Sequence, residues 1–98
     1  MKILNKVKVG GIFYKVIQNY IFKETELMGQ AEHRETEIRI SSKTPNNTCY
    51  SRQKIEECFL HEILHCVDNI YNCQKLDEDT ITRLSQGLYQ VFNDNKIF

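Results

Sequence analysis

The sequence of 98 residues lacks several features that define whole classes of protein. It has no tryptophan, only one proline, and no run of about 20 apolar residues such as a membrane-spanning helix needs. Its 13 basic residues balance 13 acidic ones and never form a run, so neither a nucleic acid nor a membrane is predicted as a partner. The N-terminal stretch is charged at Lys2 and again at Lys6, and the apolar segment between them is too short for a signal peptide. We therefore expect a cytoplasmic protein.

The four cysteines do not form a recognisable metal or disulfide pattern. They stand at positions 49, 58, 66 and 73, with no C-x-x-C pair and no sign of secretion. Cys58 and Cys66 fall in an apolar stretch and are interpreted as small core residues. Cys73 follows His65 by eight residues and stays open as a metal ligand.

Composition and pattern predict one α+β domain over residues 1–98, with 41% hydrophobic and 27% charged residues. Residues 1–48 are expected to form a small antiparallel sheet of three or four strands. The evidence is a β-branched and aromatic stretch at 12–18 and an apolar–polar alternation at 37–42. Residues 49–98 are expected to form two helices.

The first helix is predicted from about Tyr50 to Tyr71, with Thr48 or Ser51 as its N-cap. The second begins near Asp77, where acidic residues suit the positive end of a helix dipole. Its expected core face follows a spacing of three and four residues: Ile81, Leu84, Leu88 and either Val91 or Phe92.

The first helix carries the H-E-x-x-H motif as His61-Glu62-Ile63-Leu64-His65. Two histidines four residues apart lie on one face of a helix, where both imidazoles can bind one zinc ion. The intervening Glu62 can then act as a general base on water. The alternative is a helix with two partly exposed histidines and a solvated glutamate.

A catalytic zinc site needs a third protein ligand. Glu78 and Asp79 follow His65 by thirteen and fourteen residues. Glu78 is preferred because it shares the helical stripe of Ile81, although helix N-terminal acidity would also explain both.

Other residues have open roles. Asp68 shares the face of His61 and His65, so it is either a hydrogen-bond partner of a ligand imidazole or a surface charge. A peptide substrate could add to an edge strand, for which the segment 38–42 is preferred. The candidates for stabilising an oxyanion remain four: Tyr50, Tyr71, Tyr89 and His33.

The C-terminal two thirds resembles small zincin-like metallopeptidases of phage and mobile-element origin, of the gluzincin type and related to the ImmA/IrrE peptidases. The resemblance rests on the strand at 37–42, the motif segment 59–65 and the segment 78–95. Glu78 with Ile81, Leu84 and Ser85 matches the spacing after the glutamate ligand in that family. The resemblance implies zinc bound by His61, His65 and Glu78, and peptidase chemistry on protein substrates that include repressors.

Two functions follow from these observations. The first is a zinc-dependent peptidase in which Glu62 is the base. The second is a non-catalytic zincin-fold module that binds proteins. The intact Glu62 favours the peptidase, because a purely structural site has no use for a base beside the metal.

Overall fold

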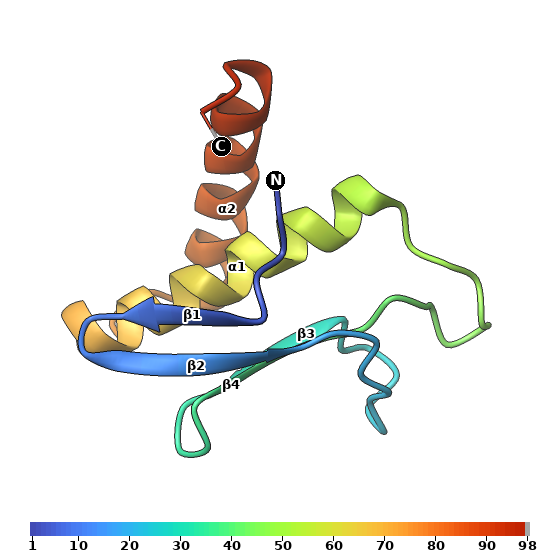
Figure 1. Ribbon diagram of the computed structural model, residues 1–98, viewed down its shortest axis with the longest axis horizontal. Helices are drawn as coiled ribbons and strands as arrows, with labels where there is room; N and C mark the ends of the chain where they lie inside the picture. Colours follow the sequence, from blue (N-terminus) through green and yellow to red (C-terminus); the bar gives the residue numbers. More distant parts are fainter. Residues whose placement is uncertain (98) are drawn as a thin grey trace.

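The computed structural model describes residues 1–97 and shows four strands followed by two helices (Figure 1). The α+β class and the order of elements are therefore as predicted from the sequence. The elements are β1 Lys6–Val9, β2 Ile12–Ile17, β3 Gly29–Glu32, β4 Glu37–Ile40, α1 Arg52–Tyr71 and α2 Glu78–Asp94.

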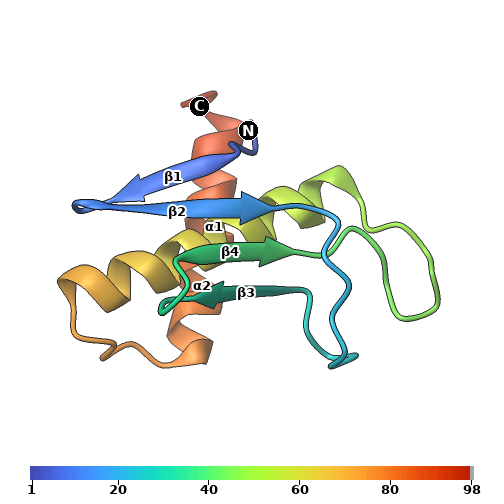
Figure 2. The same cartoon turned by 60° about the horizontal axis from the view of Figure 1, so that its bottom comes forward.

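The four strands form one sheet in the order β1-β2-β4-β3 (Figure 2). The expected antiparallel sheet is corrected to a mixed one, because β2 pairs with β4 in parallel. The loop 18–28 carries the chain to the far edge, where β3 runs back, and the turn 33–36 then reverses it into β4. Two reversals leave β4 parallel to β2, a result that alternation along each strand cannot reveal.

The helix α1 crosses one face of the sheet, and α2 packs against α1 rather than against the strands (Figures 1 and 2). The core lies between α1 and the sheet. Its most buried side chains include Tyr14, Ile38, Ile40, Phe59 and Cys66. Away from the sheet, α1 packs against α2, and the Met1 amino group pairs with Glu56 on α1.

Local hydrogen bonds fix the ends of both helices. Ser51 is the N-cap of α1 and accepts a hydrogen bond from the Lys54 amide at 3.1 Å. Asp77 caps α2 by accepting a hydrogen bond from the Thr80 amide at 2.7 Å. The chain leaves α1 through Cys73 and Gln74, both with positive φ.

The buried face of α2 agrees with the expected one only in part. Ile81, Ser85 and Tyr89 are buried, whereas Leu84 is 47% exposed and Val91 is 41% exposed. The helix touches only α1, so the buried stripe is narrow and includes polar residues that have partners on α1. Ile81 is buried as expected and Leu88 and Phe92 are half-buried, but hydrophobicity alone placed Leu84 in the core and did not include Ser85 and Tyr89.

Within residues 1–97, neither helix combines the length and the hydropathy that crossing a membrane requires.

Candidate metal centre

The helical spacing of His61 and His65 brings their rings together on the surface of α1. The two Nε2 atoms are 3.2 Å apart, and the ring centroids are separated by 4.9 Å. Both rings are partly buried, with side-chain exposures of 17% and 26%. The α1 backbone thus presents two nitrogen donors toward one point.

Glu78 completes the cluster from the first residue of α2. The turn after α1 returns the chain toward the histidines, and Asp77 caps the new helix immediately before Glu78. The two carboxylate oxygens of Glu78 lie 2.7 Å from His61 Nε2 and 2.8 Å from His65 Nε2. Asp79, the other candidate, instead pairs with Arg83 at 3.1 Å.

The donor set fits a small divalent cation. One donor atom from each of His61, His65 and Glu78 lies within 4.8 Å of the other two. Tetrahedral zinc with Zn–N bonds of about 2.0–2.1 Å would place its nitrogen ligands about 3.3 Å apart. The observed 3.2 Å between the two imidazole nitrogens agrees with that geometry. The cluster could therefore hold a metal ion with little rearrangement of α1.

Ser85 on α2 orients the first histidine. Its hydroxyl donates to the Thr82 carbonyl at 2.9 Å and lies 3.5 Å from His61 Nδ1, at the long limit for a hydrogen bond. Because the hydroxyl proton is already committed, the hydroxyl oxygen can accept from Nδ1–H and leave Nε2 free for a metal. Burial lowers the pKa of His61, which favours the neutral form that binds metals, although Glu78 opposes the shift.

Glu62 points away from solvent beside the cluster. It is 5% exposed, and burial together with the charge of Glu78 raises its pKa to about 8. Strand β3 passes so close that a Cβ on Gly29 would lie 2.8 Å from Glu62 Oε2 and 2.5 Å from Cys58 Sγ. Only glycine allows this approach, and it packs the edge strand against the candidate base.

A cavity of about 240 Å³ adjoins Glu62 and the metal cluster. Its walls come from the segment before β3, from the first half of α1 and from α2. The lining residues that matter here are Gly29, Cys58, His61, Glu62, Glu78 and Ser85. A small ligand group therefore has room beside both the cluster and the carboxyl group of Glu62.

Two residues proposed from the sequence lie outside the cluster. Asp68 is buried, but its carboxylate accepts from Asn72 Nδ2 at 2.8 Å and from the Leu76 amide at 3.3 Å. It holds the turn between the helices, which is neither of the two roles expected. Cys73 is exposed and is not part of the one candidate metal group found in residues 1–97.

The expected edge strand is also corrected. The segment 38–42 includes most of β4, which lies inside the sheet between β2 and β3. The strand at the edge next to α1 and the cavity is β3. Its short sequence Gly29-Gln30-Ala31-Glu32 has little apolar–polar alternation, so no local pattern predicts this strand strongly.

Sequence reasoning did not assign functions to Gly29 or Ser85. The role of Gly29 depends on the packing of β3 against Glu62 on α1, and the role of Ser85 depends on the packing of α2 against His61 on α1. The position of Ser85, seven residues after Glu78 and so on the same helical face, was the available signal for a contact with the histidines.

The fold and the site together define a small α+β protein with a candidate His-His-Glu metal centre on its two helices. Comparison with models of known families, with curated proteins and with solved structures gave no significant match.

Proposed function

We propose that this protein is a zinc-dependent metallopeptidase in which His61, His65 and Glu78 hold the metal and Glu62 is the general base. The observation that carries the proposal is the position of Glu62. Its carboxyl group is buried at a cavity that the cluster also lines. A metal site that served only stability would not need a second, uncoordinated carboxyl group there.

When bound, zinc supplies Lewis-acid chemistry, polarising a carbonyl group and lowering the pKa of water. The raised pKa of Glu62, about 8, describes the protein without a cation, and a bound divalent cation would lower this pKa and so favour the ionised form that a general base needs. Glu62 would take a proton from the attacking water at one carboxylate oxygen. It would then deliver that proton to the nitrogen of the departing amine.

An extended peptide is the substrate that this surface fits best. Strand β3 pairs with β4 on one side only, so alternate backbone groups on its other side can pair with a substrate strand. Gly29 lies at the cavity, so a peptide added there would run past Glu62. The resemblance to ImmA/IrrE peptidases suggests that repressor proteins are among the substrates.

The alternative, a non-catalytic zincin-fold module, would bind proteins without cleaving them. The same experiment separates the two functions. Purified protein is reconstituted with zinc, its metal content is measured, and cleavage of unfolded casein and of a fluorescence-quenched peptide library is followed.

One zinc per chain is expected in wild type, with loss in His65→Ala and Glu78→Ala but not in Asp79→Ala, the matched control. Glu62→Gln should keep its zinc and lose about 100-fold or more in cleavage rate. Zinc binding without cleavage would favour the binding module. Failure of wild-type protein to bind zinc would rule out the proposed site.

A further inference from the structure

His33 follows the edge strand β3 directly and begins the turn that leads into β4. It is partly buried and follows Ala31, which packs against the core, by two residues, and the charge of His65 helps to lower its pKa. The start of β3 is packed on Glu62 through Gly29. The strand therefore extends from the candidate base at its first residue to the neighbourhood of His65 at its end.

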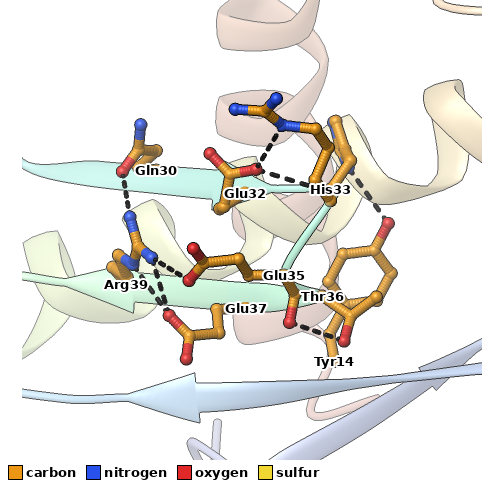
Figure 3. A network of polar contacts seen from close by, with 9 residues as sticks. Tyr14, Gln30, Glu32, His33, Glu35, Thr36, Glu37 and Arg39 are labelled. Carbon is orange, nitrogen blue, oxygen red and sulfur yellow. Dashed lines mark hydrogen bonds and ion pairs between the residues drawn. The ribbon is translucent and has the colours of Figure 1, made fainter.

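The His33 ring is held by the buried side chain of Tyr14. The Tyr14 hydroxyl lies 3.0 Å from His33 Nδ1, and the two rings meet edge to face at 6.0 Å (Figure 3). Tyr14 is 1% exposed and lies in β2, on the face of the sheet that α1 covers. A fully buried anchor of this kind restricts the ring to few orientations.

The tautomer of His33 depends on which of the partners of Tyr14 accepts the Tyr14 proton. Burial raises the pKa of Tyr14, Cys66 raises it further, and a side-chain hydrogen bond with Asn69 lowers it. The Asn69 effect is that of an amide donating to the phenolic oxygen. The hydrogen bond with Cys66 raises the pKa of Tyr14, which is the effect of Tyr14 donating its proton, so Cys66 Sγ and His33 Nδ1 are alternative acceptors of that proton. An Nδ1 atom that accepts a hydrogen bond places the ring proton on Nε2.

We propose that His33 is a catalytic residue, donating a hydrogen bond from Nε2–H to the substrate carbonyl oxygen as it becomes negatively charged, and that Tyr14 is its positioning residue. This inference rests on the proposed peptidase function. Burial and the nearby His65 lower the pKa of His33, while Glu32 and Asp68 oppose them. A neutral ring with a fixed N–H suits donation to an oxyanion.

The other residues considered for this role are engaged elsewhere. The Tyr89 hydroxyl donates to Glu56 Oε1 at 3.0 Å, on the N-terminal half of α1. The side chain of Tyr71 is directed to the β1–β2 turn, where its hydroxyl lies 3.5 Å from the place of a Cβ on Gly10. Tyr50 precedes the N-terminus of α1. His33 is the candidate that approaches the C-terminal half of the motif.

The test compares kinetics and binding in zinc-loaded protein. His33→Ala should lower kcat about 100-fold with KM changed less than about twofold, because the interaction forms only as charge develops. His33→Gln, which keeps an N–H donor, should recover part of the rate. Arg34→Ala is the matched control, since that side chain in the same turn is 95% exposed.

Binding supplies a readout that does not depend on turnover. In a Glu62→Gln background, His33→Ala should weaken binding of an N-phosphorylated leucine dipeptide, which carries a tetrahedral anion, about 10-fold or more. Binding of a substrate peptide selected from the library should stay the same. Nitrogen-15 chemical shifts of the metal-free protein should show the Nε2–H tautomer in wild type and its loss in Tyr14→Phe.

The outcomes separate this inference from the proposed function. If wild type cleaves peptides and His33→Ala cleaves them equally well, the role of His33 is overturned and the peptidase stands. An equal loss of kcat and of zinc content in His33→Ala would also overturn it, because that result indicates a structural role. If zinc-loaded wild type neither cleaves peptides nor binds the phosphorylated dipeptide, both proposals fail.

Discussion

At the scale of single residues, the geometry beside the metal cluster depends on a position without a side chain. Gly29 lets β3 lie against Glu62 and Cys58, and any Cβ there would overlap both. Close packing of a strand on a charged side chain excludes water from that side of the carboxyl group. The exclusion is one reason why burial raises the pKa of Glu62.

We predict that Gly29→Ala lowers the free energy of unfolding by about 1–3 kcal/mol, because the added methyl group must displace backbone or the two neighbouring side chains. Peptide cleavage should fall more than zinc affinity, since Glu62 moves and the ligands do not. Urea denaturation and zinc titration measure the two effects. Gly87→Ala is the control: its Cβ would meet nothing within 4 Å, and a glycine-to-alanine change inside a helix should stabilise by about 0.5–1 kcal/mol.

Combining Cys58→Ala with Gly29→Ala tests whether steric overlap with the added methyl group causes the destabilisation. Removing the sulfur relieves one of the two overlaps, so the double variant should be more stable than the sum of the single changes predicts. Simple additivity would show that the destabilisation of Gly29→Ala has another origin.

At the scale of elements, the metal centre depends on the turn that joins the two helices. The three ligands come from the middle of α1 and the start of α2, so the turn 72–77 sets the position of Glu78 relative to the histidines. Asp68 organises this turn. Its carbonyl accepts from the amides of Asn72 and Gln74, and its carboxylate accepts from the Asn72 side chain and the Leu76 amide.

We predict that Asp68→Ala destabilises the protein by about 1–3 kcal/mol, because a buried acceptor is lost and its donors are left without it. Zinc affinity should fall as well, since Glu78 is no longer held over the two histidines. Asp79→Ala removes an exposed pair with Arg83 and one acidic residue from the first turn of α2, and it should change stability by less than about 1 kcal/mol. Unchanged zinc affinity in Asp68→Ala would show that the turn does not position Glu78.

At the scale of the whole molecule, a third buried carboxyl group, besides those of Glu62 and Asp68, ties the N-terminal segment and both helices together. Glu56 on α1 binds the Met1 amino group at 3.1 Å, the Tyr89 hydroxyl at 3.0 Å and Arg52 at 2.9 Å. Burial alone would raise the pKa of Glu56, but these three partners outweigh it and lower the pKa below the ordinary value of 4.5. The ionised form is therefore the one that the folded state stabilises.

The direction of this shift predicts a loss of stability in acid. A carboxyl group with a lowered folded-state pKa contributes stability above its unfolded pKa of 4.5 and loses it as the pH falls through the folded value. At pH 7, Glu56→Gln should be less stable than wild type by about 1–3 kcal/mol, because charge-assisted hydrogen bonds are replaced by neutral ones. The difference should shrink steadily below about pH 4.5, as measured by urea denaturation of the metal-free proteins. A difference that does not depend on pH would contradict this account, and Glu24→Gln, in an exposed loop, controls for the loss of one charge.

The sequence by itself determined the elements and the chemistry of the motif. Local patterns act over a few residues. β-branched and aromatic residues identified β2, alternation identified β4, and capping or acidic residues located the helix starts. Helical spacing placed His61 and His65 on one face. The helical stripe that Glu78 shares with Ile81 also favoured Glu78 over Asp79, and the structure brings Glu78 to the histidines.

Only the tertiary structure decided the rest, because those features depend on contacts between segments far apart in the chain. The parallel pairing of β2 with β4 and the edge position of β3 follow from the path of the loop 18–28. The buried side of α2 depends on α1 as its one neighbour, which selects Ser85 over Leu84. The meeting of Tyr14 with His33 joins residues nineteen apart, and no local periodicity encodes such a contact.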